Sequence, residues 1–300
     1  MSELNPPAAE AALAETTLLP GLSAVAQAYD VVFCDVWGVI HNGVAAYEAA
    51  HDALTRFRRA GGTAILISNA PRPGTAVMTQ LDRLGVPREA YDDIVTSGDM
   101  TRMTVEERIA EPLFHIGPPR DAPIFEGLPT RFAPVEEASY VVCTGLWNDR
   151  EETPDDYRGL FEPLVARRAP LICANPDIVV EVGGTLVYCA GALATLYEEM
   201  GGPAVYFGKP HEPVYREALA RAARLRGEEV PVSRVLAIGD AIRTDIAGAA
   251  GIGADALFIA KGIHAEDLKL EADRLDPEIA RAFFAEQPHR PKAAMALLGW

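Results

Sequence analysis

Polar residues that can act as nucleophiles, bases or metal ligands follow short apolar runs at four places far apart in the chain. In chain order these residues are Asp35, Ser68, Asn69, Lys209, Asp240 and Asp245. Alone, each would more often have an ordinary role: the aspartates as caps of a turn or helix, Ser68 and Asn69 as loop residues, and Lys209 as a solvated amine. Together they provide a carboxylate nucleophile, a hydroxyl group and an ammonium group. Such a set suits phosphoryl transfer, in which catalysis consists mainly of positioning and charge neutralisation.

An excess of negative charge among these residues indicates a metal ion. Asp35, Asp240 and Asp245 would bring three carboxylates together, and Lys209 alone would offset them. A hard divalent cation with oxygen ligands resolves that conflict, and Mg²⁺ is the usual one. We therefore predict Mg²⁺ as the cofactor.

The alternation of strands and helices predicts the sheet that gathers these residues. Apolar runs alternate with amphipathic stretches, which is typical of a doubly wound parallel sheet, an α/β fold with helices on both faces. The carboxyl ends of its strands meet at one edge, where ligands bind. The runs assigned to this sheet are Val31–Cys34, Ala64–Ile67, Ile94–Thr96, Ala204–Phe207, Val235–Ile238 and Ala256–Ile259. The helices predicted with it are Tyr47–Ala60, one from Pro73 to Gly85, and Val214–Leu225, the last with Leu225 on its apolar side.

The middle of the chain predicts a smaller α/β module inserted into the larger one. Its strands are predicted at His115–Gly117, Tyr140–Thr144, Leu171–Ala174 and Thr185–Cys189, with a helix from Asp155 to Arg168. A further helix is predicted at Ala192–Met200. We assign residues 1–108 and 191–300 to the main domain and residues 109–190 to the inserted domain.

Composition narrows the choice of partners. The formal net charge is -16, so nucleic acid and anionic membranes are not expected to bind, whereas a local cation can still attract a small phosphorylated metabolite. The four cysteines lie far apart in apolar runs, which predicts buried, reduced thiols and no zinc site. They are Cys34, Cys143, Cys173 and Cys189. The first ten residues lack the features of a signal peptide, and no apolar run is long enough to span a bilayer. We expect a cytoplasmic protein.

Four motifs carry a resemblance to a known family. In order they read D-V-W-G-V, I-S-N-A, G-K-P and G-D-A-I-R-T-D, and they resemble the motifs of the haloacid dehalogenase superfamily. The long insertion after the second motif contains A-N-P-D at Ala174–Asp177 and resembles the class IIA branch, which includes nucleotide, sugar-phosphate and pyridoxal-phosphate phosphatases. The resemblance implies a Rossmann-like core with an α/β cap, a phosphatase of small phosphomonoesters, and a homodimer formed through the cap.

The resemblance also implies a role for each motif residue. Asp35 would take the phosphoryl group as an aspartyl phosphate, which divides one hard displacement into two easier ones. Mg²⁺ would be held by Asp35, the backbone carbonyl of Trp37 and Asp240. Ser68 and the backbone N–H of Asn69 would bind phosphoryl oxygens, Lys209 would screen the nucleophile, and Asp245 would orient Lys209 or a metal-bound water. Asn175 and Asp177 would lie near the leaving group.

Trp37 departs from the family pattern. Phosphatases of this superfamily usually carry an aspartate there as the general acid, and loss of such a group typically costs about a hundred- to ten-thousandfold in rate. Two side chains are candidates for the missing proton donor, His41 and Asp177. Trp37 also leaves two alternatives open: a dehalogenase-like hydrolase that attacks carbon, and a weakly active protein that binds a metabolite for regulation. Tyr47 and Trp147 are candidates for stacking on a substrate ring, although an aromatic residue more often belongs to the core.

Overall fold

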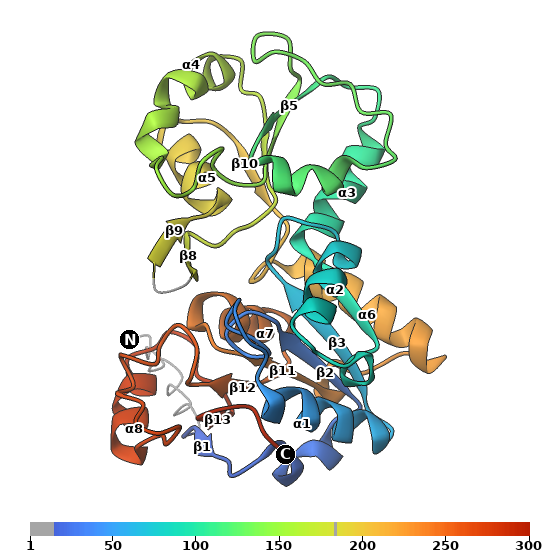
Figure 1. Ribbon diagram of the computed structural model, residues 1–300, viewed down its shortest axis with the longest axis vertical. Coiled ribbons are helices and arrows are strands. Elements are labelled where there is room, and N and C mark those ends of the chain that lie inside the picture. Colours follow the sequence, from blue (N-terminus) through green and yellow to red (C-terminus); the bar gives the residue numbers. More distant parts are fainter. Residues whose placement is uncertain (1–14, 183–184) are drawn as a thin grey trace, which may run out of the picture.

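The computed structural model describes residues 15–182 and 185–300, which form two lobes joined through the middle of the molecule (Figure 1). The acidic stretch at the start of the chain, which we judged not to be a signal peptide, lies outside the described residues. Within the described part of the chain, no helix combines the length and apolar character needed to cross a membrane.

The larger lobe is built on a seven-stranded sheet in which every pair of neighbouring strands is parallel. The order across the sheet is β1, β13, β12, β11, β2, β3, β4. The strands are β1 Thr17–Leu18, β13 Ala293–Met295, β12 Asp255–Ile259, β11 Val235–Gly239, β2 Val31–Asp35, β3 Thr63–Ser68 and β4 Asp93–Thr96. The predicted strands that correspond to β2, β3, β4, β11 and β12 are confirmed, whereas β1 and β13 were not predicted.

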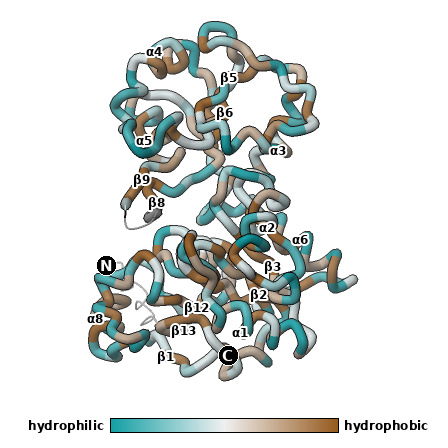
Figure 2. Tube along the Cα trace, in the orientation of Figure 1, coloured by the Kyte–Doolittle hydropathy of each residue, from teal (hydrophilic) through white to brown (hydrophobic). Residues whose placement is uncertain are grey.

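Helices cover both faces of this sheet because successive side chains of a strand point to opposite faces. On β2, Val32 and Cys34 pack against α1 and α2, whereas Val31 and Phe33 pack against α6, α7 and α8. These helices are α1 Glu48–Arg59, α2 Gly74–Arg83, α6 Glu212–Arg226, α7 Ala247–Ile252 and α8 Pro277–Ala285. Hydrophobic residues accordingly concentrate on the central strands, and hydrophilic ones on the outer loops (Figure 2). The doubly wound α/β fold is confirmed.

The smaller lobe has its own parallel sheet of four strands, in the order β10, β7, β6, β5. Its strands are β5 Leu113–Ile116, β6 Tyr140–Cys143, β7 Leu171–Cys173 and β10 Ala204–Tyr206, and its helices are α4 Arg158–Ala166 and α5 Ala190–Glu199. The helix α3, Ser97–Glu107, leads into it, and an antiparallel hairpin of β8 Val179–Val182 and β9 Thr185–Tyr188 projects from it (Figure 1). We call this lobe the cap.

Two assignments at the cap boundary were wrong. The run Ala204–Phe207 was assigned to the large sheet, but β10 pairs with β7 of the cap, and Val205 faces Ile172. The helix placed after residue 190 in the main domain is α5, which packs in the cap, where the Tyr197 ring contacts Phe161 at 5.0 Å between centroids. The cap sheet therefore continues to Tyr206 rather than ending near residue 190.

Two smaller expectations can also be checked against the structure. Leu225 was predicted on the apolar side of α6 but is 52% exposed, because the buried face of that helix is formed by Val214, Tyr215, Ala218 and Ala222. The four cysteines are free and buried, as predicted.

Candidate active site

The centre of the large sheet is the point where its winding reverses. From β2 the chain adds β3 and β4 on one side, whereas β11, β12 and β13 follow one another on the other side. Ligand sites of open α/β sheets lie at the strand carboxyl ends beside such a reversal. Asp35 ends β2, Ser68 ends β3, and Asp240 directly follows β11. The structure therefore places these three residues together, as the sequence predicted.

Lys209 reaches the same place from the segment that returns the chain from the cap to α6. Its Nζ donates to Asp35 Oδ1 at 2.5 Å and to Asp245 Oδ1 at 2.6 Å. All three side chains are at most 10% exposed. The expected link between Asp245 and Lys209 is present. Lys209 was predicted to follow a strand of the large sheet, but the strand that precedes it, β10, belongs to the cap.

Asp245 is held by an unusual helical turn. Residues Ile242–Ile246 form a π-helix, a conformation that is rare and concentrates at functional sites. The second carboxylate oxygen of Asp245 accepts the backbone N–H of Ala241 at 3.2 Å. The turn thereby holds the Asp245 carboxylate through Oδ2, while Oδ1 of the same group contacts Lys209.

Among the residues that the structure describes, no lysine or arginine is bonded to Asp240. Its Oδ2 accepts the backbone N–H of Ile263 at 2.9 Å. Two glycines enclose the carboxylate, because a β-carbon built on Gly38 or on Gly262 would collide with it. Gly38 also has φ of +84°, a conformation that favours glycine. These two glycines and Ile263 were not singled out from the sequence, although glycines directly after a strand end are a usable signal of close packing.

The three carboxylates form one acidic group that Lys209 does not neutralise. One oxygen each from Asp35, Asp240 and Asp245 lies within 4.8 Å of the others. Burial raises the pKa of Asp240 well above its usual range, and the charges of Asp35 and Asp245 raise it further. Burial likewise raises the pKa of Asp35, and it raises that of Asp245 to about 6 although Lys209 opposes it. For Lys209 burial lowers the pKa, but the charges of Asp245 and Asp35 outweigh that effect and raise it overall.

This donor set fits a hard divalent cation. Carboxylate oxygens are the ligands that Mg²⁺ prefers, and a buried excess of negative charge is what a cation would neutralise. Asp240, which has no cationic side chain bonded to it and lies in the cradle formed by Gly38 and Gly262, is suited to hold it together with Asp35. The backbone carbonyl of Trp37 as a third ligand stays a prediction.

Asn69 has a role that the sequence did not suggest. Ser68 Oγ accepts the N–H of Ala70 at 3.2 Å, a local contact that leaves its hydroxyl hydrogen available. The Asn69 side chain instead bridges the two lobes: its Oδ1 accepts the backbone N–H of Lys209 at 2.7 Å, and its Nδ2 donates to Asp177 Oδ1 at 2.8 Å. The phosphate-binding role predicted for the backbone N–H of Asn69 stays a prediction.

The A-N-P-D turn is packed tightly over this site. The side-chain oxygen of Asn175 accepts the N–H of Asp177 at 3.0 Å, so Asn175 shapes the turn. A β-carbon on Gly191 would collide with the backbone of the turn, and one on Gly208 would collide with Pro176 and Asn69. Of the two residues predicted near the substrate, Asp177 reaches the site, whereas the Asn175 side chain oxygen is engaged within its own turn.

Trp37 and His41 belong to a small loop beside the site. The Trp37 ring lies against Gly43 and edge-on to His41, at 5.1 Å between centroids. His41 is 1% exposed, and its Nδ1 accepts the N–H of Gly43 at 2.9 Å. Burial lowers the pKa of His41 to about 4, so it is neutral at neutral pH. Both side chains serve the structure of the loop, and His41 is not suited to donate a proton to substrate.

The aromatic residues proposed for stacking have other contacts. Trp147 is 45% exposed and packs on Tyr157, at 5.2 Å between ring centroids. The ring of Tyr47 lies under Lys261 Nζ, 5.5 Å from the ring centroid. Neither contact places a ring over Asp35, so their role in substrate binding stays a prediction.

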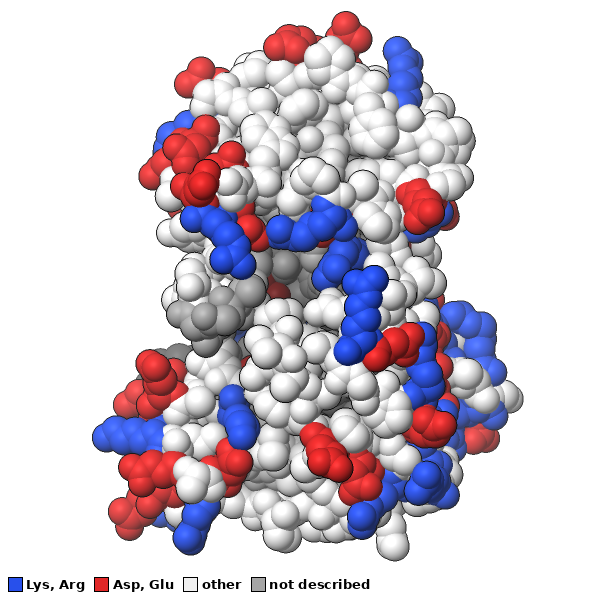
Figure 3. All heavy atoms as spheres, viewed as in Figure 1, with Lys and Arg blue, Asp and Glu red and all other residues white. Residues whose placement is uncertain are grey.

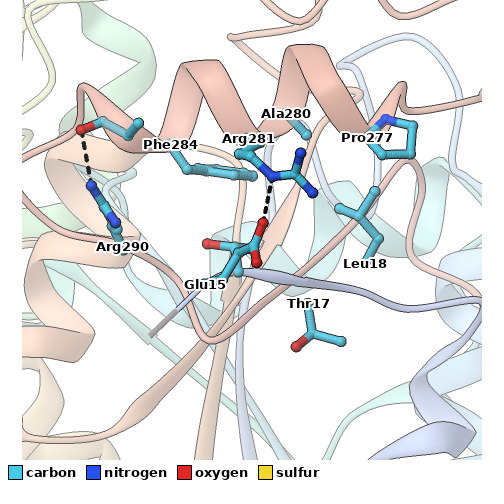
Figure 4. Close-up of a pocket in the computed structure, with 10 residues that line it drawn as sticks. Glu15, Thr17, Leu18, Pro277, Ala280, Arg281, Phe284 and Arg290 are labelled. Atoms are coloured by element: carbon cyan, nitrogen blue, oxygen red, sulfur yellow. Dashed lines mark hydrogen bonds and ion pairs between the residues drawn. The ribbon is translucent and has the colours of Figure 1, made fainter. Parts of the chain in front are cut away.

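Two hollows are visible, and they differ in chemistry. One of about 600 Å³ lies between β1 and α8, where Leu18 and Phe284 line it and Glu15 pairs with Arg281 (Figure 4). It lies at the edge of the sheet, where β13, β12 and β11 separate β1 from the strand β2 that carries Asp35. The other lies between the lobes, and Lys and Arg side chains gather along its edge on the face shown in Figure 3. At the junction of the lobes, Asn69 of the core is hydrogen-bonded to Asp177 of the A-N-P-D turn.

Fold and site together define a doubly wound α/β protein with an acidic centre at the sheet reversal and a cap domain. The family model described as haloacid dehalogenase-like hydrolase matches residues 32–128, and the one described as HAD-hydrolase-like matches residues 206–283. A solved hydrolase of the haloacid dehalogenase-like family from Brucella suis is 45% identical, covers 94% of this chain and 100% of its own, and superposes with a TM-score of 0.82. The chain belongs to the haloacid dehalogenase-like hydrolase family.

More distant structures share the fold. A possible sugar phosphatase from Cytophaga hutchinsonii is 18% identical, covers 94% of this chain and 98% of its own, and has a TM-score of 0.76. A 4-nitrophenylphosphatase from Thermotoga maritima is 20% identical, with coverages of 92% and 97% and a TM-score of 0.68. The search of curated proteins gave no match. These neighbours are consistent with the class IIA arrangement of core and cap.

Proposed function

We propose that the protein is a Mg²⁺-dependent phosphatase that hydrolyses a small phosphomonoester through an aspartyl phosphate on Asp35. The observation that carries the proposal is the ion-paired group of Lys209 with Asp35 and Asp245, next to the unpaired carboxylate of Asp240. Three buried carboxylates with one lysine favour a divalent cation as the missing charge. When bound, Mg²⁺ would polarise the phosphoryl group and neutralise its charge.

Each of the site residues has a separate role in this reaction. Asp35 Oδ attacks phosphorus in line with the leaving oxygen, and Lys209 keeps the attacking carboxylate from repelling the phosphoryl dianion. The hydroxyl of Ser68 donates to a phosphoryl oxygen at the end of the neighbouring strand. Asp245 holds Lys209 in place through the 2.6 Å contact. Attack of water on the aspartyl phosphate releases inorganic phosphate and restores Asp35.

The basic rim of the hollow favours an anionic substrate despite the net charge of -16. Arg72 of the core lies 3.9 Å from Asp121 of the cap, and Arg120 of the cap pairs with Asp149. Local cations can concentrate a charged ligand at a cleft even on an acidic protein. The positive edge in Figure 3 therefore supports a phosphorylated metabolite as substrate.

The test is a panel of phosphomonoesters assayed for phosphate release with Mg²⁺ and with chelator. We expect release with Mg²⁺ only, and none from Asp35→Asn, whose amide cannot form the aspartyl phosphate. Turnover that persists in Asp35→Asn or in chelator would contradict the proposal.

The position of Trp37 favours one other function, binding without turnover. The indole neither donates nor accepts a proton in the reaction, so the protein could act as a sensor of a phosphorylated metabolite. Calorimetric titration beside the phosphate-release assay separates the two, because a sensor binds the ester and leaves it intact. A dehalogenase-like reaction gains no support from the acidic group, since carboxylate attack on carbon requires no divalent cation.

A further inference from the structure

The reaction proposed above needs a proton donor for the leaving oxygen, and the usual position holds Trp37. The cap brings the carboxyl group of Asp177 to the site, where it accepts a hydrogen bond from Asn69. Asp177 belongs to the A-N-P-D turn, and its negative charge acts on the nucleophile Asp35 itself, where it raises the pKa. We propose that Asp177 donates the proton to the leaving oxygen and later accepts one from the attacking water. This inference rests on the proposed phosphatase function.

The position of Asp177 is fixed by contacts from both lobes. Asn69, the residue after Ser68, donates from Nδ2 to Asp177 Oδ1 at 2.8 Å and also to the backbone carbonyl of Lys209 at 3.1 Å. Its own Oδ1 accepts the N–H of Lys209 at 2.7 Å. A single amide thus ties the cap carboxyl to the residue that contacts Asp35. These contacts hold Asp177 beside the ion pair of Lys209 with Asp35.

The turn itself is rigid enough to position an acid. The N–H of Gly191, at the start of α5, donates to the backbone carbonyl of Asp177 at 3.2 Å. Asn175 closes the turn on its other side through the N–H of Asp177. Neither Gly191 nor Gly208 leaves room for a β-carbon, so the turn is closely packed against both residues. Asp177 is half-buried, and the hydrogen bond from Asn69 engages its Oδ1 rather than its Oδ2.

The surroundings of Asp177 favour a carboxyl group that can carry a proton. Burial raises its pKa, and the negative charge of Asp245 raises it further, whereas the hydrogen bond from Asn69 and the charge of Lys209 lower it. In the protonated form Oδ1 still accepts from Asn69, so Oδ2 is the oxygen that carries the hydrogen. The other candidate, His41, has both a low pKa and a buried ring.

The two steps balance as follows. Asp35 Oδ forms a bond to phosphorus while the bond from phosphorus to the leaving oxygen breaks, and the Asp177 proton passes to that oxygen, so that a neutral alcohol leaves. Water then attacks the aspartyl phosphate, its proton passes to the Asp177 carboxylate, and the bond between Asp35 and phosphorus breaks. Inorganic phosphate is released, and both carboxyl groups return to their starting states. No oxidant, reductant or further reactant is required.

The test compares leaving groups in Asp177→Asn, which keeps the shape and the acceptor oxygen but has no acidic proton. Alkyl phosphates should lose about a hundredfold or more in kcat, because an alkoxide leaves poorly without a proton, whereas p-nitrophenyl phosphate should change by less than about tenfold. Asp177→Glu should recover part of the loss on alkyl phosphates. Asp155→Asn, a 75% exposed carboxylate of the cap paired with Arg158, is the matched control and should leave both substrates unaffected.

Each other outcome overturns the inference. An equal loss on both kinds of ester would mean that Asp177 only positions the cap, and no loss on either would mean that it takes no part. Unfolding curves of Asp177→Asn and wild type should coincide, and Asp177→Glu provides the same comparison if the first variant folds poorly. Failure of the phosphatase proposal looks different, because then the wild-type protein releases no phosphate from either ester, or Asp35→Asn still does.

Discussion

Asp240 carries a negative charge that no lysine or arginine among the described residues is bonded to. In the absence of metal, we therefore expect the variant Asp240→Asn, which lacks this charge, to be more stable than the wild-type protein. In Asp240→Asn the oxygen that accepts the Ile263 N–H is kept and the negative charge is lost. Carboxylate oxygens of Asp35 and Asp245 lie within 4.8 Å of that of Asp240. At this separation two full charges repel by about 3.5 kcal/mol at an effective dielectric constant of about 20. The two repulsions together exceed what one lysine, bonded to the other two carboxylates, can offset.

The raised pKa of Asp240 determines how this difference varies with pH. The folded protein binds the proton up to a higher pH than the unfolded chain does, because the folded-state pKa lies well above the usual value. The stability that comes from the protonated form is therefore complete at low pH and is lost as pH rises through the folded-state pKa. Since part of the repulsion is relieved by that proton, we expect Asp240→Asn to raise the free energy of unfolding by about 2 kcal/mol near neutral pH and in chelator. The advantage should shrink toward low pH.

Denaturant unfolding in chelator and in Mg²⁺ measures both effects. Wild type should gain about 2.7 kcal/mol at a Mg²⁺ concentration a hundredfold above its dissociation constant, and Asp240→Asn should gain much less. The order of stability should therefore reverse between the two conditions. If Asp240→Asn were less stable than wild type in chelator, or gained as much from Mg²⁺, the idea of a charge deficit at this site would be refuted.

Two further substitutions test the neighbourhood of the site. In the Asp177→Asn background, Trp37→Asp should recover turnover of alkyl phosphates more than that of p-nitrophenyl phosphate, because it restores an acid at the usual position; equal changes on both esters would argue against a missing proton. Gly262→Ala should weaken Mg²⁺ binding about ten- to a hundredfold in a calorimetric titration, because its β-carbon would displace the Asp240 carboxylate. Gly251→Ala in α7, where a β-carbon meets nothing within 4 Å, is its control, and equal affinities for the two variants would contradict the cradle.

The sequence predicted those strands and site residues whose structure depends mainly on neighbouring residues in the chain. The run before Asp35 is apolar at every position because β2 is buried on both faces, and the polar residue at its end is the point where the sheet reverses. Sheet membership is different. The three residues of β10 are as apolar as a core strand, and only their pairing with β7 shows that they belong to the cap. A pattern along the chain does not state which strand will be the partner.

The candidate site divides in the same way. Asp35 and Asp240 were predictable because strand ends converge whatever the details of packing. The bridging role of Asn69 was not, since its two main contacts lie 108 and 140 residues away in the chain. The cradle formed by Gly38 and Gly262 was equally hidden, because it depends on two loops that meet only around Asp240. Short β1 and β13, three residues at most, carry too little periodicity to identify.

The route by which Lys209 enters the site limits how this enzyme could be re-engineered. The lysine stands on the strand-to-helix return of the cap, so the segment that leaves the upper lobe also supplies the ammonium group of the lower one. A different cap grafted onto this core would need a lysine just after its last strand. The backbone N–H of that lysine would have to reach the side chain of Asn69, and its ammonium group would have to reach Asp35. A graft that matched only the substrate-facing loops would leave Asp35 and Asp245 without their shared counter-ion.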